Sequence, residues 1–400
     1  MNTTTRSTRH RVVVLGAGYA GMSAATGLAK RLHPDTARVH LVNARDHFVQ
    51  RPRLHQVATG QHIRERSLAE PFGRAPVNLT VGWIHEIDLD NRRVDIATTG
   101  GTTSLQYDTL VYALGTSIDT TTVPGIEEYA HTLDPADAAR IAGKLADLDR
   151  GTVIVCGGGL TGIEAATEFA ERYPQLTVRL VSRGRPGGWL SDRARAHVEA
   201  AFDRLGVEVL ADREITAVED GVVRLGDGSG IPFDLCLWAG GFRVSPLAAD
   251  AGLAVDERGR ALVDQTLRSV SHPEVYVIGD AAAARGPWGD AIAYGCRTGG
   301  FLGLYAPGAV MAALTGRDPK AFGFRYIHQC ISLGRRDAVI QFVHQNDESP
   351  RRRILTGRAA VWYKDIVLNS GTWVFRRPGP ILPWRKTKVP TTPGRPVTHV

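Results

Sequence analysis

Two copies of one pattern predict an α/β protein built from two doubly wound units. In each copy, a short apolar run typical of a buried strand leads into glycines at G-x-G-x-x-G spacing and then into helix-forming residues. The first copy spans residues 12–21 and the second spans 152–164. This turn from strand to helix is a site for a dinucleotide pyrophosphate, so two copies indicate two cofactors and electron transfer between them.

The three glycines of each turn have separate roles. Gly16 permits the tight turn, Gly18 lets a phosphate approach the backbone, and Gly21 lets the helix pack closely on the strand. The corresponding glycines of the second turn are Gly157, Gly159 and Gly162.

The composition is that of an ordinary soluble globular protein, with 43% hydrophobic and 22% charged residues in a chain of 400, long enough for two or three domains. No apolar run approaches the roughly 18 to 20 residues that span a bilayer, and the first ten residues are too polar for a signal peptide. We therefore expect a cytoplasmic protein. The net charge of +7 comes from scattered arginines, without the lysine-rich arms typical of nucleic-acid binding. It suits an anionic cofactor or lipid headgroups, or reflects composition bias alone.

The four cysteines, Cys156, Cys236, Cys296 and Cys330, include no C-x-x-C pair. We therefore expect neither a local redox disulfide nor a zinc site. Cys156 and Cys236 lie in apolar runs and are expected to be inert core residues.

The second strand of the first unit, residues 39–42, ends at Asn43. An acid is usual here, because it accepts hydrogen bonds from the adenosine ribose. Two interpretations are open: the Asn43 amide oxygen replaces the acid, or Asn43 only opens a turn. An alternating stretch follows at 77–107, with turn residues near 88–91 and 100–101, and then a buried strand within 107–116 that leads into a glycine turn.

Five motifs now carry a family resemblance, in the order GAGYAG, HQVATG, YDTLVYALG, GGGLTGIEAATEFAE and VYVIGDAA. The chain resembles the two-dinucleotide flavoprotein reductases of the pyridine nucleotide-disulfide oxidoreductase fold, and most of all the type II NADH:quinone oxidoreductases, over roughly residues 11–336. The resemblance implies FAD in the first unit. It also implies that Gly279 and Asp280 bind the flavin ribityl and pyrophosphate region and that Gly115 and Thr116 lie against the cofactor.

By the same resemblance, two Rossmann-like units are nested, with the NAD(P)H-binding domain inserted into the FAD-binding domain. The FAD-binding domain is expected in two stretches, 1–118 and 269–318, with the NAD(P)H-binding domain at 119–268 between them. A C-terminal α+β segment is expected at 319–400. That last segment is expected to cover the flavin and to face a homodimer partner or a membrane.

Within the second unit, Asp134 and Pro135 predict a helix N-cap and first turn. The strand at 178–181 ends at Ser182, and Arg183 and Arg185 follow. A small hydroxyl with neighbouring arginines accommodates the 2′-phosphate of NADP, whereas an acid here favours NAD. We therefore predict NADPH over NADH; the alternative is that both arginines are solvated loop charges.

Five residues are candidates for catalysis: Glu164, Tyr294, Cys296, His328 and Cys330. By resemblance Glu164 lies near the nicotinamide and flavin; alternatively it only favours the helix N-terminus. Tyr294 stands at one of the two positions where the quinone reductases have glutamines, and so the quinone signature is lost.

The resemblance also implies that Tyr294, Cys296 and Arg297 face the acceptor; helix packing, and for Arg297 a solvated surface, are the alternatives. Because the family folds the region after residue 319 over the flavin, we hypothesise that Cys330 approaches the flavin near Cys296. A reactive thiolate there needs a lowered pKa.

Residues 359–384 match the amphipathic membrane anchor of the membrane-bound family members. Polar residues and a glycine at 365 and 369–371 interrupt its apolar face, so we expect it to pack on the chain's own body or on a partner subunit. From Trp384 onward, several prolines predict a mobile tail.

The sequence thus predicts an FAD-dependent NAD(P)H oxidoreductase that passes a hydride from NADPH, or NADH, to FAD and on to a small organic acceptor, quinonoid or aromatic. Two alternatives remain, a peripheral-membrane type II NADH:quinone dehydrogenase and a nucleotide-binding redox sensor with negligible turnover. Membrane association and a homodimer are both open.

Overall fold

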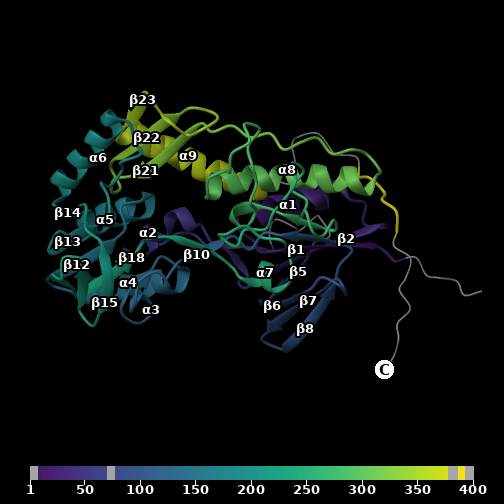
Figure 1. Cartoon of the computed structure of the whole chain (residues 1–400), viewed down its shortest axis with the longest axis horizontal. Helices are drawn as coiled ribbons and strands as arrows, with labels where there is room; N and C mark the ends of the chain where they lie inside the picture. The colour runs from purple at the N-terminus through teal and green to yellow at the C-terminus, as the bar shows by residue number, and fades with distance from the viewer. Residues whose placement is uncertain (1–7, 70–76, 377–385, 392–400) are drawn as a thin grey trace, which may run out of the picture.

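The computed structural model describes residues 8–69, 77–376 and 386–391. Two α/β units lie side by side, and a C-terminal segment runs across the top of both in the view of Figure 1. Three stretches named above lie outside the described residues: 1–7 at the N-terminus, 377–384 of the apolar segment and 392–400 of the tail.

The first unit is built on five parallel strands in the order β20, β9, β1, β2, β5. These strands are β1 (His10–Leu15), β2 (Ala37–Asn43), β5 (Val77–Val81), β9 (Thr109–Tyr112) and β20 (Val275–Val277). Helix α1 (Tyr19–Arg31) connects β1 to β2 and packs against α8 (Cys296–Leu314). Since β1 and β9 are almost fully buried, their side chains form the centre of the largest hydrophobic core.

The second unit repeats this topology with five parallel strands in the order β11, β18, β12, β13, β14. These strands are β11 (His131–Thr132), β12 (Gly151–Cys156), β13 (Leu176–Val181), β14 (Glu208–Leu210) and β18 (Leu235–Trp238). Helix α5 (Leu160–Arg172) connects β12 to β13. Helix α4 (Pro135–Asp147) begins where the sequence predicts, because the Asp134 carboxylate accepts hydrogen bonds from the backbone N–H groups of Ala136 and Asp137.

The chain leaves the first unit after β9 and returns to it with β20, so the second unit is inserted in the first, as the resemblance implies. The two segments that connect the units pair with each other as the antiparallel strands β10 (Thr116–Ile118) and β19 (Phe242–Val244). Each unit also carries a three-stranded antiparallel sheet. These are β6 (Trp83–Asp88), β7 (Arg93–Thr98) and β8 (Gly101–Gln106) in the first unit, and β15 (Ile215–Glu219), β16 (Val222–Leu225) and β17 (Gly230–Pro232) in the second.

The C-terminal segment folds as an antiparallel sheet followed by one long helix. The sheet consists of β21 (His328–Ser332), β22 (Ala338–Val343) and β23 (Pro350–Thr356), and the helix is α9 (Gly357–Arg376). Ile331, Leu333 and Val339 of this segment belong to the core of the second unit, while α9 also contacts α1 of the first. The segment therefore ties the two units together, and α9 packs on the chain's own body.

The described part of the tail, residues 386–391, corrects the prediction of a mobile tail. Thr387 accepts a hydrogen bond from the backbone N–H of His33 and donates its own N–H to the Arg31 carbonyl. Val389 is buried in the first unit. The prolines that suggested mobility do not prevent this pairing, because 386–391 runs as an extended strap along the end of α1.

The shorter elements complete the fold. They are β3 (His47–Phe48), η1 (Arg51–Arg53), α2 (Leu54–Val57), β4 (Arg66–Ser67), α3 (Ile126–Tyr129), α6 (Asp192–Leu205), α7 (Leu247–Asp250) and η3 (Gly279–Ala281).

Candidate active site

The first glycine-rich turn joins β1 to α1 with little space to spare. Gly16 has φ +93°, and a Cβ atom on Gly21 would lie 1.9 Å from the Gly16 carbonyl oxygen. Only glycine at 21 lets the helix approach the turn this closely. Gly18 differs, because a Cβ atom there would meet no atom within 4 Å. The turn is therefore tight at its ends and open at its middle, beside the N-terminus of α1.

The second glycine-rich turn, between β12 and α5, has the same geometry. Gly157 has φ +126°, and a Cβ atom on Gly162 would lie 1.8 Å from the Gly157 carbonyl oxygen. Gly159 faces open space, as Gly18 does. These two glycines are the N-cap residues of α5 and α1, so no side chain caps either helix. The first N–H groups of both helices are thus directed toward space in which an anion can bind.

Asn43, at the carboxyl end of β2, closes the first glycine turn. Its Oδ1 accepts a hydrogen bond from the Ala17 N–H at 2.9 Å, and its Nδ2 donates to the Arg45 carbonyl at 2.8 Å. The amide therefore orders the turn through both of its polar atoms. Its contact with a ribose stays a prediction.

Asp280 joins the two turns that the resemblance assigned to the flavin, 115–116 and 279–280, to Gly295 before α8. Its carboxylate accepts hydrogen bonds from Thr116 Oγ1 at 3.1 Å and from the Gly295 N–H at 2.8 Å. Gly115 and Gly279, beside these residues, have φ +69° and +73°. Arg51 Nη1 donates to the Thr116 carbonyl at 2.7 Å. Residues from the ends of β9 and β20 and from the start of α8 thus meet at one edge of the first sheet.

The four acceptor-side candidates lie on or next to two neighbouring elements. Cys296 is the first residue of α8 and Tyr294 lies two residues before it, while His328 and Cys330 lie on β21. Arg297 joins the two elements, since its Nη1 donates to the His328 carbonyl at 3.1 Å and its guanidinium pairs with Glu348. A solvated surface role for Arg297 is therefore wrong.

The titration of these candidates follows from their burial. Burial raises the pKa of Cys330 to about 12, which is opposite to what a reactive thiolate needs. Burial also lowers the pKa of His328, whose Nδ1 lies 3.1 Å from the Tyr363 hydroxyl. Cys156 and Cys236 are buried core residues, as predicted, and all four cysteines are free.

Ser182 ends β13, where the second unit is expected to bind the nucleotide ribose. It is buried, and its hydroxyl donates a hydrogen bond to the Gly184 carbonyl. Arg185 pairs with Glu199 at 2.6 Å. Arg183 is exposed and makes no hydrogen bond or ion pair with any residue that the structure describes. Of the two arginines, only Arg183 therefore has its guanidinium available.

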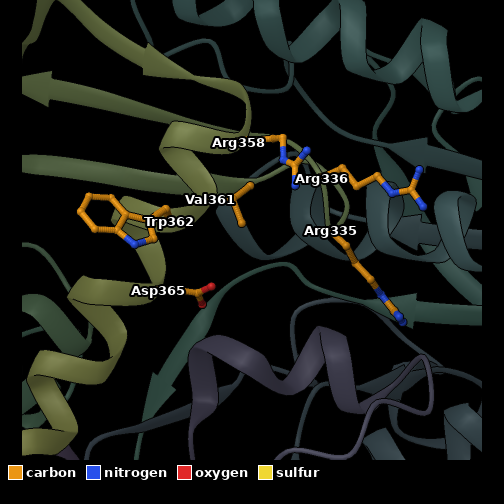
Figure 2. Close-up of a pocket in the computed structure, with 6 residues that line it drawn as sticks. All are labelled: Arg335, Arg336, Arg358, Val361, Trp362 and Asp365. Carbon is orange, nitrogen blue, oxygen red and sulfur yellow. The ribbon is translucent and has the colours of Figure 1, made fainter.

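A cavity of about 680 Å³ opens between the loop that follows β21 and the first turns of α9. Figure 2 shows the side chains around it. They are Arg335, Arg336, Arg358, Val361, Trp362 and Asp365.

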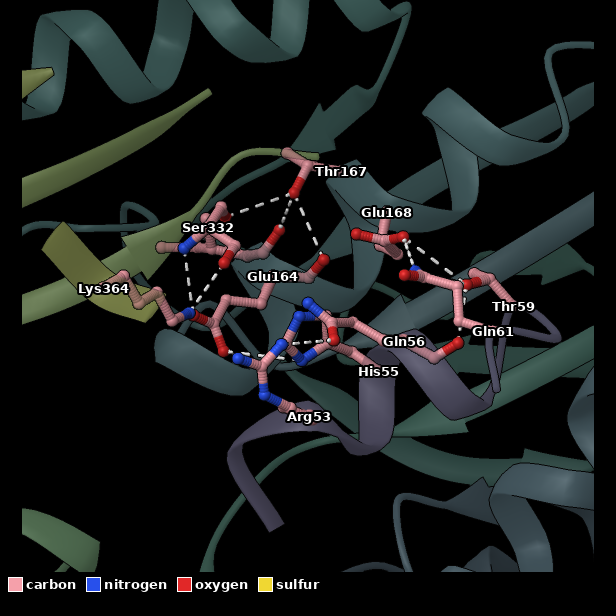
Figure 3. A network of polar contacts seen from close by, with 11 residues as sticks. Arg53, His55, Gln56, Thr59, Gln61, Glu164, Thr167, Glu168, Ser332 and Lys364 are labelled. Carbon is pink, nitrogen blue, oxygen red and sulfur yellow. Dashed lines mark hydrogen bonds and ion pairs between the residues drawn. The ribbon is translucent and has the colours of Figure 1, made fainter. Parts of the chain in front are cut away.

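Next to this cavity, Glu164 on α5 is the centre of a buried polar network (Figure 3). Its carboxylate accepts a hydrogen bond from the Ser332 N–H at 3.0 Å and pairs with the Lys364 ammonium. Lys364 Nζ also donates to Ser332 Oγ at 2.7 Å. On the other side, His55 Nδ1 lies 3.7 Å from Glu164 Oε2. The network joins α2, α5, β21 and α9.

The charges in this network stabilise one another. Burial alone would raise the pKa of Glu164, but the Lys364 charge, His55 and the hydrogen bonds from Lys364 and Ser332 hold it below its usual value. Burial lowers the pKa of His55 to about 4, although Glu164 opposes this shift. At neutral pH, Glu164 is therefore ionised and His55 is neutral. His55 Nε2 is buried and has no hydrogen-bond partner among the described residues.

A second carboxylate, Glu168, lies one turn further along α5. Burial raises its pKa, and Arg335, whose Nε lies 2.9 Å away, only partly opposes the shift. Gln61 also donates to Glu168. Two neighbouring carboxylates thus have pKa values displaced in opposite directions.

Sequence reasoning identified Glu164 but missed His55, Ser332, Lys364 and Glu168. His55 and Glu168 lie within motifs quoted for the resemblance, and the signal there was a titratable side chain in an otherwise apolar stretch. Lys364 carries no local signal, because its partner lies 200 residues away in the chain.

Among the described residues, no helix is both long and apolar enough to cross a bilayer, and no group of three or more His, Cys, Asp or Glu side chains could hold a metal ion.

Two glycine turns on two nested parallel sheets are typical of a protein that binds two dinucleotides. The chain belongs to the pyridine nucleotide-disulphide oxidoreductase family, whose model matches residues 10–297. It is therefore an oxidoreductase that depends on FAD and NAD(P)H.

The chain is similar to several known relatives. It is 31% identical to an NADH dehydrogenase-like protein of Mycobacterium tuberculosis, over 82% of this chain and 87% of that protein. It is 26% identical to the demethylphylloquinone reductase NdbB of Synechocystis, over 95% and 98% of the two chains.

Two solved structures share the fold. The sulfide:quinone oxidoreductase of Aquifex aeolicus has a TM-score of 0.76 and 19% identity, over 92% of this chain and 91% of that one. NDH2 of Plasmodium falciparum in complex with NADH has a TM-score of 0.77 and 15% identity, over 92% and 96%.

Proposed function

We propose that this protein oxidises NADPH, in preference to NADH, and reduces a small quinonoid or aromatic acceptor. The observation that carries this proposal is the buried contact between Glu164, Lys364 and Ser332. It supplies an ionised carboxylate and an ammonium beside a cavity large enough for an organic molecule. Relatives named as NADH:quinone oxidoreductases and as a demethylphylloquinone reductase support the acceptor class.

The residues of the first unit fit FAD. The open space at Gly18, beside the N-terminus of α1, suits a pyrophosphate, and Asp280 with Thr116 suits the ribityl chain. When bound, FAD accepts two electrons from the nicotinamide and passes them to the acceptor. The proposed FAD-binding stretches are 1–118 and 269–318, with NAD(P)H bound by 119–268 and 319–400 as the C-terminal cover.

The second unit fits a nicotinamide nucleotide with a 2′-phosphate. Gly159 leaves space for the pyrophosphate at the N-terminus of α5. At the end of β13, Ser182 adds no negative charge, and Arg183 has its guanidinium free for a phosphate. Both features support NADPH as the electron donor.

Reduction of a quinone to a hydroquinone takes up two protons as well as two electrons. Lys364 Nζ donates hydrogen bonds to the Glu164 carboxylate and to Ser332 Oγ. We propose that this ammonium is the group that orients the acceptor and gives it a proton, while Glu164 keeps the ammonium in place.

Steady-state oxidation of NADPH and of NADH by the FAD-loaded enzyme, with menadione as acceptor, tests the proposal. We expect turnover with both nucleotides and a higher kcat/KM for NADPH. Negligible turnover with both would support the redox sensor instead.

A second candidate function is that of a peripheral-membrane quinone dehydrogenase. The observation that favours it is on α9, where Trp362 and Ile366 are 68% and 45% exposed and lie one helical turn apart. Sedimentation with liposomes and turnover with a long-chain quinone would support this candidate, and the absence of both would reject it.

A further inference from the structure

The cavity beside α9 carries an unbalanced positive charge. Of its charged side chains, Asp365 pairs with Arg53 at 2.7 Å and Arg335 pairs with Glu168 at 2.9 Å. Arg336 and Arg358 are exposed and have no hydrogen-bond or ion-pair partner within the described part of the chain. Two guanidinium groups at the cavity are thus left without a carboxylate.

The remaining lining suits a flat ring. Trp362 is 68% exposed beside the cavity, and Val361 lies one position before it on α9. An indole face binds aromatic rings by stacking, and the guanidinium fork binds carboxylate or sulfonate groups through two parallel hydrogen bonds. The volume of about 680 Å³ is within the range of small-molecule sites. The lining therefore matches an aromatic molecule that carries an anionic group.

The cavity also lies next to the buried network. Val361 and Asp365 flank Lys364 on α9, at positions three before it and one after it. The other wall is tied to α5, because Arg335 holds Glu168, one turn from Glu164. Figures 2 and 3 show these side chains at the junction of the same elements. The cavity is therefore adjacent to the network, whose members Glu164, Lys364 and Ser332 lie behind its lining.

We propose that this cavity binds the electron acceptor and that the acceptor is an aromatic organic anion, a quinonoid ring bearing a carboxylate, which Arg336 and Arg358 select. The inference rests on the proposed function. The net reaction is NADPH plus one proton plus the quinone carboxylate, giving NADP⁺ and the hydroquinone carboxylate. NADPH supplies two electrons with one proton, Lys364 gives the second proton and is reprotonated from solvent, and the carboxylate is unchanged.

The test compares two acceptors in the FAD-loaded enzyme: a naphthoquinone carboxylate, and menadione, which shares the ring system and has no charge. We expect the R336A/R358A variant to raise the KM for the carboxylate by about tenfold or more. The kcat/KM for menadione should stay within about twofold of the wild-type value, since menadione has no charge to lose. Arg258→Ala, at an exposed arginine on the loop between α7 and β20, is the matched control and should change neither value.

Three outcomes would overturn the inference: an unchanged KM for the carboxylate, an equal loss for both acceptors, or a raised KM for NADPH alone, which would assign the arginines to the nucleotide. Equilibrium dialysis of naphthoate, which has no quinone to reduce, separates this inference from the proposed function. If the wild type binds naphthoate and R336A/R358A does not, the cavity is an aromatic-anion site that depends on the two arginines. This conclusion holds even if the enzyme does not reduce the quinone. If both bind naphthoate equally, the inference is wrong whatever the turnover.

Discussion

Lys364 and Glu164 are separated by 200 residues in the chain, yet their side chains form an ion pair buried where α9 meets α5. Ser332 binds both partners, through its hydroxyl to Lys364 and through its N–H to Glu164. The pair thus joins the second unit to the C-terminal segment. The same ion pair therefore stabilises this junction and holds the ammonium that we propose as the proton donor.

Replacing Lys364 by Met should leave Glu164 as a buried carboxylate without its counter-charge. We expect the free energy of unfolding to fall by about 3 to 5 kcal/mol, the usual cost of removing one partner of a buried pair. The E164Q/K364M double variant should lose less unfolding free energy than K364M, because it has no buried carboxylate without a counter-charge. Urea unfolding measures both. A wild-type midpoint for K364M would contradict the account.

Stability should fall in weak acid because of His55. Its folded pKa of about 4 lies below the ordinary value of 6.5, so the unfolded chain binds more protons between these two pH values. The free energy of unfolding therefore decreases as pH falls through this window, by up to roughly 3 kcal/mol. Glu164, whose pKa is also lowered, adds a loss only at the acid end.

Replacing His55 by Gln should flatten this pH dependence, since no group remains at position 55 to titrate. Urea unfolding of both proteins across the window is the measurement. Parallel profiles would mean that His55 is not the group responsible. The charged groups that act on it, Glu164, Lys364 and Arg53, are the same in both proteins.

The packing of α8 on α1 should be sensitive to a single methyl group. A Cβ atom on Gly303 would lie 2.2 Å from the Ala20 carbonyl oxygen, so Gly303→Ala forces the two helices apart. We expect a loss of about 1 to 3 kcal/mol. Gly308→Ala on the same helix meets no atom within 4 Å and should be neutral or stabilising by up to about 1 kcal/mol. Equal thermal midpoints for the two variants would contradict this packing argument.

Replacing Arg183 by Ala tests the nucleotide preference. If its guanidinium binds the 2′-phosphate, the KM for NADPH should rise by about tenfold while the KM for NADH stays the same. Arg258→Ala again serves as the control. A similar change in the KM values for NADPH and NADH would show that Arg183 does not bind the 2′-phosphate.

Much of the fold could be predicted because its signals are local. The glycines of both turns, the apolar strands that precede them and the Asp134 N-cap each depend on residues a few positions apart, and the structure has all of them. The resemblance placed Thr116 and Asp280 each near the flavin, and the hydrogen bond between them is seen only in the structure.

The rest depends on long-range contacts, which no local pattern reveals. Asp365 interrupts the apolar face of α9, as expected, but its ion pair with Arg53, 312 residues away in the chain, could not be predicted. Gly371 lets the helix approach Tyr19, whose Cε1 would lie 3.2 Å from a Cβ atom at that position. Lys364 was missed for the same reason, since its role is defined only by Glu164.

Anaerobic stopped-flow absorbance tests the central claim most directly. The purified flavoprotein is mixed separately with NADPH and with NADH, and the reduced protein is then mixed with a water-soluble quinone. We predict that NADPH bleaches the flavin faster than NADH and that the quinone restores the oxidised spectrum. If neither nucleotide bleaches the flavin, or if the quinone leaves it reduced, the protein is not the NAD(P)H-dependent acceptor reductase proposed for it.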